Sequence, residues 1–128
     1  MPIETIKNRG DFLSAAARGK KFITGTFILQ MLARPESHPA NSCSTGQSPR
    51  FGFTVTKKMG NAVIRNRIKR RLRAAVRQTA LRHVVSGHDY VIISRHKALG
   101  CPFPDLQRDM EFAFSRIPSI KDTPNKQS

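Results

Sequence analysis

The sequence predicts an α/β sandwich in which one small mixed β-sheet is packed with about three helices. Its 128 residues suit a single domain, and a hydrophobic content of 38% is enough to form a core. Helical and strand-like segments follow one another in the order helix, strand, strand, helix, strand, helix. Because helices and strands alternate in this way, the helices are expected to pack against one sheet.

The N-terminal half is predicted to form one helix and two strands. The segment Lys7 to Arg18 contains an alanine run that favours a helix. Phe22 to Ala33 is rich in β-branched and aromatic residues and is predicted to form one strand. Arg50 to Thr56 alternates between large apolar and small residues, which is typical of a second strand. Between the strands, residues 34–49 contain three prolines and are predicted to form a flexible loop.

The C-terminal half is predicted to form a long helix, a strand and a closing helix. The long helix runs from Asn61 to Arg82, and the side chain of Asn61 can cap its first turn. Its apolar residues fall in an arc of about 120°, the width of a face that packs on a core. Asp89 to Arg95 is a continuous apolar run typical of a buried strand, and Pro104 to Ile117 is predicted to form the closing helix.

The chain is expected to be one domain over residues 1–117, followed by a polar, disordered tail over residues 118–128. No run approaches the roughly 20 apolar residues that cross a bilayer, and the first ten residues lack the apolar centre of a signal peptide. Cys43 and Cys101 stand far apart and do not form a zinc motif. These features predict a cytoplasmic protein with no membrane partner.

The net charge of +15 and the pI near 11.3 predict an anionic polymer, most simply a nucleic acid, as the partner. A small-molecule substrate is disfavoured on the same ground. From Ser37 to His88 the chain has no Asp or Glu. The basic residues of that stretch are Arg50, Lys57, Lys58, Arg65, Arg67, Lys69, Arg70, Arg71, Arg73, Arg77 and Arg82.

The basic residues of the long helix gather on one face. On a helical wheel Asn66, Arg70, Arg73 and Arg77 lie within about 60° of one another, nearly opposite the apolar face. Guanidinium groups bind phosphate oxygens in pairs, and an asparagine among them can contact base edges or sugar hydroxyls. Such a face is suited to the shape and backbone of RNA.

The segment KKMGNAVIRNRIKR, from Lys57 to Arg70, resembles the signature of the bacterial ribonuclease P protein family. Members of that family work with a catalytic RNA that removes the 5′ leader from precursor tRNA. Three further segments occur in the order expected of the family: DFLSAAARG from Asp11 to Gly19, FILQ from Phe27 to Gln30, and DYVIISR from Asp89 to Arg95. The resemblance covers about residues 6–115.

The resemblance implies two groups of site residues. The residues implied to contact the catalytic RNA are Lys57, Lys58, Arg67, Arg70 and Arg73. Those implied to contact the precursor leader, in a cleft between the first helix and the sheet, are Phe12, Thr54, Arg65, Asn66 and Lys69. The resemblance also implies a parallel strand pair joined through the basic helix by a left-handed crossover, whereas the general rule for such connections is right-handed.

Three positions bear on leader binding because the family can have an aromatic residue there. Phe12 can be either a core residue or, as the resemblance implies, a platform for a leader base. Ala16 stands where a second aromatic residue is frequent in the family, and Gln30 where a tyrosine can occur. Because stacking of one base contributes about 1–3 kcal/mol, these two residues predict weaker or differently placed leader binding. By contrast, four other aromatic residues are predicted to form the core: Phe51, Phe53, Phe112 and Phe114.

The sequence assigns no catalytic residue to the polypeptide. Its histidines are scattered, and its clustered carboxylates are only Asp105, Asp109 and Glu111. Favourable charge at a helix N-terminus explains these acids, and a metal role is the alternative. A two-metal nuclease needs several converging carboxylates. Separately, the resemblance implies that Mg²⁺ is used by the RNA of the holoenzyme, and the sequence assigns no metal site to the protein.

Three functions account for the basic helix. The first is the protein subunit of ribonuclease P, with the catalytic RNA and precursor tRNA as partners. The second is a ribosomal or general structured-RNA-binding protein with no role in cleavage. The third is a DNA-binding protein that places the helix in a groove of the duplex. Dependence on the leader separates the first from the second, and competition by duplex DNA separates both from the third.

Overall fold

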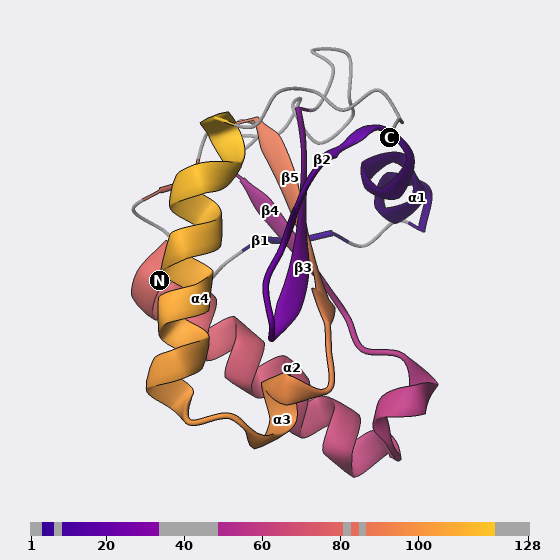
Figure 1. Cartoon of the computed structure of the whole chain (residues 1–128). Helices are drawn as coiled ribbons and strands as arrows, with labels where there is room; N and C mark the ends of the chain where they lie inside the picture. Colours follow the sequence, from indigo (N-terminus) through magenta and orange to yellow (C-terminus); the bar gives the residue numbers. More distant parts are fainter. Residues whose placement is uncertain (1–3, 7–8, 34–48, 81–82, 85–86, 120–128) are drawn as a thin grey trace.

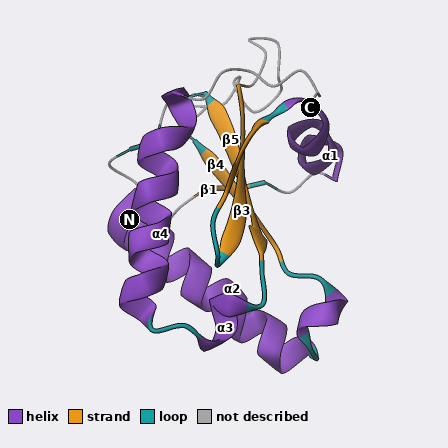
Figure 2. Ribbon diagram, viewed as in Figure 1, coloured by secondary structure: helices purple, strands orange, loops and turns teal. Residues whose placement is uncertain are grey.

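The computed structural model describes residues 4–6, 9–33, 49–80, 83–84 and 87–119. Its centre is a mixed five-stranded sheet with the strand order β1-β4-β5-β3-β2. Helices lie on both sides of the sheet, with α1 on one face and α2 and α4 on the other (Figures 1 and 2). The predicted fold class, a small mixed sheet packed with helices, is confirmed.

The sheet combines parallel and antiparallel pairs around the central strand β5. Its strands are β1 (Glu4–Thr5), β2 (Lys20–Ile23), β3 (Phe27–Ala33), β4 (Arg50–Thr54) and β5 (His88–Ser94). β5 pairs with β4 in parallel and with β3 in the antiparallel direction. β1 adds a parallel edge to β4, and β2 forms an antiparallel hairpin with β3. The parallel pair β4–β5 joined through α2 matches the pair that the family resemblance implied; the handedness of its crossover stays a prediction.

In the described part of the chain, four α-helices, two 3-10 turns and one π-helical segment connect and cover the strands. In chain order they are α1 (Arg9–Arg18), the 3-10 turn η2 (Lys57–Met59), α2 (Ala62–Ala75), the π-helical segment η3 (Val76–Ala80), α3 (Lys97–Gly100), α4 (Phe103–Arg116) and the 3-10 turn η4 (Ile117–Ser119). Among the helices of the described part, none is long and apolar enough to cross a membrane.

The two faces of the sheet bury cores of different size. Alternate residues of β5 point to opposite faces, so Tyr90 and Ile92 join the large core beneath α2 and α4 while Val91 lies beneath α1. Phe51 pairs with Tyr90 in register, and their rings stack with centroids 5.6 Å apart. Phe114 of α4 packs on the same rings. Burying each such side chain contributes about 1.5–3 kcal/mol, so the larger core fixes α2 against the sheet.

The predicted strand over Phe22 to Ala33 is wrong, because the segment forms two strands. The chain reverses at Gly25, and Ile23 pairs with Ile28 across the resulting hairpin. Thr24 closes the turn: its backbone N–H donates to Phe27 O at 2.9 Å, and its hydroxyl oxygen accepts from Phe27 N at 3.0 Å. A glycine between two threonines thus interrupts the strand and reverses its direction.

Three further expectations differ from the structure. The basic helix is α-helical only to Ala75 and continues as a π-helical segment, in which the Thr79 hydroxyl donates to Ala75 O at 2.6 Å. Phe112, predicted to lie in the core, is 48% exposed because it lies on the outer side of α4, where its ring meets Phe22 edge-on. The two-residue strand β1 and the one-turn helix α3 were not predicted, since neither is long enough to show a period.

The predicted loop and tail fall mostly outside the described residues. Residues 34–48 and 120–128 lie outside them. Pro118 and Ser119, which the sequence assigned to the disordered tail, form η4 together with Ile117. The backbone oxygen of Pro118 accepts a hydrogen bond from Lys20 Nζ at 3.2 Å, which joins this turn to β2.

Candidate nucleic-acid interface

The basic helix α2 is fixed by its buried face and by its first turn. Ile68, Leu72 and Ala75 are buried against the sheet and α4. Asn61 caps the helix as predicted, because its side-chain oxygen accepts a hydrogen bond from Ile64 N at 3.0 Å. The preceding Gly60 has a φ of +141°, a conformation that favours glycine, and a Cβ there would lie 2.9 Å from Ile64 Cδ1. The tight turn between η2 and α2 therefore depends on Gly60.

The residues implied to bind the catalytic RNA are mainly on the outer surface. Lys57 and Lys58 are exposed on η2, and Arg67 and Arg70 are exposed on α2. None of the four forms an ion pair with an acidic residue that the structure describes. Arg73 is half-buried, and its guanidinium lies 5.6 Å from the ring centroid of Phe53 on β4. Arg73 therefore lies on the side of α2 that faces β4.

Among the described basic residues of the acid-free stretch, Arg71 and Arg50 donate side-chain hydrogen bonds within the protein. Arg71 donates from Nη2 to the carbonyl oxygen of Cys101, and its guanidinium lies 5.9 Å from the ring centroid of Phe103. Arg71 thus holds α2 to the segment between α3 and α4. It is directed away from the outer surface, although it is next to Arg70 in the sequence.

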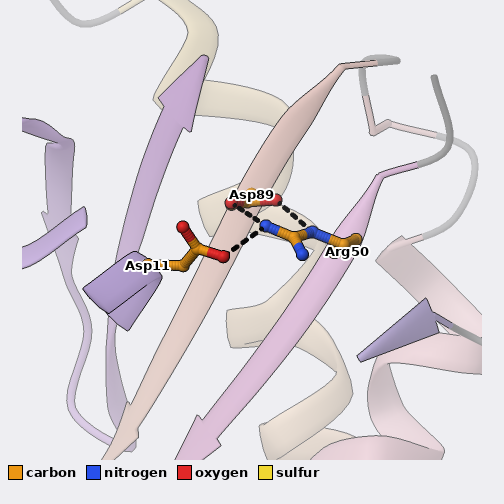
Figure 3. A network of polar contacts seen from close by, with 3 residues as sticks. All are labelled: Asp11, Arg50 and Asp89. Atoms are coloured by element: carbon orange, nitrogen blue, oxygen red, sulfur yellow. Dashed lines mark hydrogen bonds and ion pairs between the residues drawn. The ribbon is translucent and has the colours of Figure 1, made fainter. Parts of the chain in front are cut away.

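Arg50 forms a partly buried network with two carboxylates (Figure 3). It donates to both oxygens of Asp89, from Nε at 2.9 Å and from Nη2 at 2.7 Å, and to Asp11 Oδ2 from Nη2 at 3.0 Å. The hydrogen bonds with Asp89, and then with Asp11, raise the pKa of Arg50 above its already high ordinary value, against the opposing effect of burial. The network joins α1, β4 and β5, so the charge of Arg50 is neutralised within the fold.

An open groove lies between α1, the end of β4 and α2. Its volume is about 500 Å³, and its lining residues are Arg9, Phe12, Leu13, Phe53, Thr54, Val55 and Lys69. β1 pairs with β4 only at Arg50 and Phe51, so among the described strands nothing covers the outer edge of β4 beyond that point. The short edge strand thereby leaves room for the groove.

The ring of Phe12, a residue of α1, lies against Gly52 of the sheet and lines this groove. A Cβ placed on Gly52 of β4 would come within 2.4 Å of Phe12 Cε1 and 2.6 Å of Phe12 Cζ. The ring therefore occupies the space above Gly52 that a side chain would fill. Phe12 also packs against the small core beneath α1 but remains half-buried. Phe12 therefore packs against the sheet, as the core interpretation expects. Its side chain also lines the groove, where the leader-platform interpretation places it.

The structure brings together three of the five residues implied to bind the leader. Phe12, Thr54 and Lys69 line the groove, whereas Arg65 and Asn66 lie outside its lining. Arg65 is one helical turn before Lys69, and its buried Nε has no hydrogen-bond partner among the described residues. Asn66, the residue after Arg65 in α2, is exposed.

Sequence reasoning missed four groove residues: Arg9, Leu13, Phe53 and Val55. Phe53 had been assigned to the core. Leu13 is 55% exposed, which is unusual for a leucine on a short helix and places an apolar edge on the groove. Arg9 and Leu13 are four residues apart in the predicted helix, next to Phe12, so helical spacing could have indicated them.

The two departures from the family pattern occupy different surroundings. Ala16 is exposed on α1 and offers no ring to a base. Gln30 is 4% exposed and pairs in register with Val91, so it lies on the sheet face beneath α1. A leader base cannot reach Gln30 while α1 covers that face.

The clustered carboxylates on α4 do not converge. Asp105 pairs with Arg108, Asp109 accepts a hydrogen bond from the Thr26 hydroxyl at 2.8 Å, and Glu111 lies 3.6 Å from His83. In the described part of the chain no three His, Cys, Asp or Glu side chains gather in a way that could hold a metal ion. The acids on α4 therefore contribute to the contacts of the helix within the fold.

Sequence comparison matches this chain to one family model and to relatives that carry the same description. The family model described as Ribonuclease P matches residues 2–118. The ribonuclease P protein component of Brucella suis is 44% identical over 105 residues, which cover 82% of this chain and 73% of the relative. That of Paramagnetospirillum magneticum is 40% identical over 121 residues, which cover 94% and 87% of the two chains.

Solved structures share the same fold. The ribonuclease P protein of Staphylococcus aureus superposes with a TM-score of 0.67 at 25% identity and covers 87% of this chain and 92% of its own. That of Thermotoga maritima superposes with a TM-score of 0.71 at 24% identity, over 89% and 97% of the two chains. The second likeness supports the fold alone.

Proposed function

The chain belongs to the ribonuclease P protein family, and from that membership we propose that its outer basic face binds the catalytic RNA while its groove holds the 5′ leader of precursor tRNA. Membership makes the chain a subunit of a ribonucleoprotein endoribonuclease that matures the 5′ end of tRNA. The proposal concerns which surfaces of the protein contribute to that activity.

One observation carries the proposal: α2 contributes to both surfaces. Lys69 lines the groove, and Arg70, the next residue, is exposed on the outer face. A nucleic acid strand in the groove and a second RNA segment on the outer face would therefore meet along one helix. Cations on this helix offset the repulsion between the two phosphate backbones.

The groove suits a single strand better than a duplex. It is lined by apolar and aromatic side chains from α1 and β4, with Arg9 and Lys69 supplying positive charge. Single-stranded RNA is bound by this combination, since bases stack on apolar surfaces and phosphates pair with cations. We infer that Phe12 and Leu13 contact leader bases, while Arg9 and Lys69 contact leader phosphates.

We assign hydrolysis to the RNA and not to the polypeptide. The acid-free stretch from Ser37 to His88 includes most of the proposed interface, so it supplies no carboxylate for a metal-dependent cleavage step. We propose that Mg²⁺ acts on the RNA of the holoenzyme. The protein then contributes affinity and orientation for the precursor, and it acts where the other components of tRNA maturation are, in the cytoplasm.

Reconstitution tests the function directly. The purified protein is mixed with its cognate catalytic RNA and a labelled precursor tRNA at low magnesium, and 5′ leader cleavage is measured with each component omitted in turn. We expect cleavage to require the RNA and to be stimulated by the protein. Tight RNA binding without stimulation would instead favour the structured-RNA-binding alternative.

A variant at the groove tests the leader assignment. Phe12→Ala should weaken the binding of leader-bearing precursor to the holoenzyme and leave the binding of mature tRNA unchanged. Equal losses for both RNAs would mean that Phe12 acts only by packing. The exposed Leu13→Ala is a matched second variant, because it removes an apolar groove side chain that is not part of the core.

A further inference from the structure

A second hollow lies at the C-terminal end of the central strand β5. Its volume is about 390 Å³, and its lining residues are Gly25, Met59, Ser94, Arg95, His96 and Lys97. It shares no lining residue with the groove between α1 and β4. The outer basic face of α2 does not include it either, so the functions assigned above leave this hollow unexplained.

The basic residues of the hollow project from a rigid base. The backbone N–H of Arg95 donates to Thr26 O at 3.0 Å, which continues the pairing between β5 and β3. The α3 turn then follows, with Cys101 N donating to Lys97 O at 3.0 Å. Because β5 is central to the sheet, these bonds fix the backbone from which Arg95 and Lys97 project. Side chains so placed lose less conformational freedom when they bind a ligand.

The positive charges of the hollow are not neutralised within the described structure. Arg95 and Lys97 are exposed, and neither pairs with a described carboxylate. Arg95 donates from Nη1 to Thr24 O at 3.2 Å, which leaves most of its five N–H donors free. The neighbouring hairpin turn is linked to one acid, Asp109, but that carboxylate accepts a hydrogen bond from the Thr26 hydroxyl. The hollow is therefore a concave site with uncompensated cations.

The hollow is continuous with the proposed RNA-binding segment. Met59, which lines it, is the last residue of η2, and η2 also carries the exposed Lys57 and Lys58. In Figure 1 both η2 and α3 lie at the end of the molecule where α2 begins. An RNA strand that contacts Lys57 and Lys58 can therefore extend toward Arg95 and Lys97 along the same end of the protein.

We propose that this hollow is a second phosphate-binding site, in which Arg95 and Lys97 hold the backbone of structured RNA beyond the basic helix. The guanidinium of Arg95 can bind phosphate oxygens in pairs, and Lys97 adds a point charge. The site rests on the proposed function, because it extends the RNA-binding surface assigned there. The phosphates belong either to the catalytic RNA or to the body of the tRNA, and the experiment separates these sources.

The test compares two double variants that lose the same charge. Arg95→Gln/Lys97→Gln alters the hollow, and Lys21→Gln/Arg116→Gln is the matched control, with both residues exposed on β2 and at the end of α4. Binding of the full-length protein to the catalytic RNA, to precursor tRNA and to mature tRNA is measured over a range of salt concentrations. Circular dichroism and thermal unfolding check that each variant is folded.

We expect the hollow variant to bind either the catalytic RNA or both tRNAs about tenfold more weakly than wild type. The salt slope, which is the slope of log affinity against log salt concentration, should fall in magnitude by about 1.4–1.8, the value for two phosphates. Loss with the catalytic RNA, or instead with both tRNAs, identifies the source of the phosphates. Equal affinities and slopes for the hollow and control variants would overturn the site while leaving the proposed function intact. Failure of the wild-type protein to bind the catalytic RNA would overturn both.

A single variant keeps the test decisive if the double variant is unstable. Lys97→Gln removes an exposed charge with no hydrogen bond to any described residue, so it should fold like wild type. We expect it to lower the salt slope by about half as much as the double variant. An unchanged slope would count against the site.

Discussion

Single side chains determine which surfaces of this protein are open to RNA. Arg70 and Arg71 are neighbours in the sequence but have opposite roles, because successive residues of a helix point about 100° apart. Arg70 is exposed, whereas Arg71 binds the carbonyl oxygen of Cys101. Gly52 acts in a different way, since its lack of a side chain allows the ring of Phe12 to lie on the sheet.

Exchange of each neighbouring arginine should separate binding from stability. Arg70→Gln should weaken binding to the catalytic RNA and leave the thermal unfolding temperature unchanged. Arg71→Gln should lower the free energy of unfolding by about 1–3 kcal/mol, because a partly buried hydrogen bond to a charged donor is lost. The affinity of the folded Arg71→Gln protein for the catalytic RNA should be nearly that of wild type. Urea unfolding and RNA titration check both, and an equal loss of stability in the two variants would contradict the assignment.

Gly52→Ala should displace Phe12 without unfolding the protein. The new methyl group would meet the far end of the Phe12 ring, at 2.4 Å from Cε1, so the ring must move. Because one stacked base contributes about 1–3 kcal/mol, we expect leader-bearing precursor to bind about fivefold more weakly, with mature tRNA unaffected. Binding to the reconstituted holoenzyme measures both.

The control for this prediction is a double-mutant cycle. In a Phe12→Ala background no ring obstructs the new methyl group, so Gly52→Ala should have no further effect on precursor affinity. If the two changes are instead additive, Gly52 acts on the leader by a route other than the position of Phe12.

At the scale of single elements, the first turn of α2 connects stability with RNA binding. Asn61 caps the helix next to the proposed RNA contacts Lys57 and Lys58. Asn61→Ala should lower the free energy of unfolding by about 1 kcal/mol, because the N–H of Ile64 loses its acceptor. Asn61→Asp keeps an acceptor and should retain stability.

The aspartate variant should nevertheless bind RNA more weakly, because it adds a negative charge beside the phosphates. Chemical denaturation measures the first effect, and titration with the catalytic RNA measures the second. If Asn61→Asp binds RNA as wild type does, the phosphates do not approach the first turn of α2.

The sequence predicted elements well where they are long and strongly patterned. The positions of α2 and β4 followed from apolar periodicity, that of β5 from a continuous apolar run, and that of α4 from residues suited to a first helical turn. The family resemblance added the parallel pairing of β4 and β5. The hairpin at Gly25 was missed because the apolar residues on both sides of the turn, from Phe22 to Ala33, have the composition of one continuous strand. β1 was missed because its existence depends on pairing with β4 and not on its own two residues.

For the candidate site, the sequence predicted part of the groove lining but not which basic residue is neutralised within the fold. It indicated Phe12, Thr54 and Lys69, which line the groove together. It could not indicate that Arg50 is neutralised, since Asp11 and Asp89 are 39 residues away on either side and only the tertiary fold brings them together. Partners so distant in sequence leave no local signal.

At the scale of the whole molecule, the Arg50 network connects the helix α1 with the strands β4 and β5 of the sheet. The Arg50 side chain is 15% exposed, and Asp89 is 4% exposed. Loss of Arg50 from this partly buried network leaves the buried carboxylate of Asp89 without this counterion. The network thereby couples the position of α1, and so one wall of the groove, to the centre of the fold.

Arg50→Met should therefore lower the free energy of unfolding by about 3 kcal/mol. Arg108→Met is the matched control: it breaks the ion pair with Asp105, but Arg108 is 73% exposed, so we expect a loss below about 0.5 kcal/mol. Urea denaturation measures both. Similar losses in the two variants would contradict a special role for the network.

Because the pKa of Arg50 is raised, the stabilisation that depends on its charge should persist as pH rises and be lost only in strongly alkaline solution.

The central place of β5 has a consequence for how the chain is made. β4 and β3 both pair with β5, and they do not pair with each other, so the sheet cannot form as one unit until residue 94 has been synthesised. The basic helix α2 precedes β5 in the chain, so it emerges from the ribosome before β5 does. Every nascent copy therefore presents its RNA-binding cations before it has the strand that holds them in place, in an environment rich in ribosomal and transfer RNA. Folding of this protein begins in competition with the class of molecule that it is made to bind.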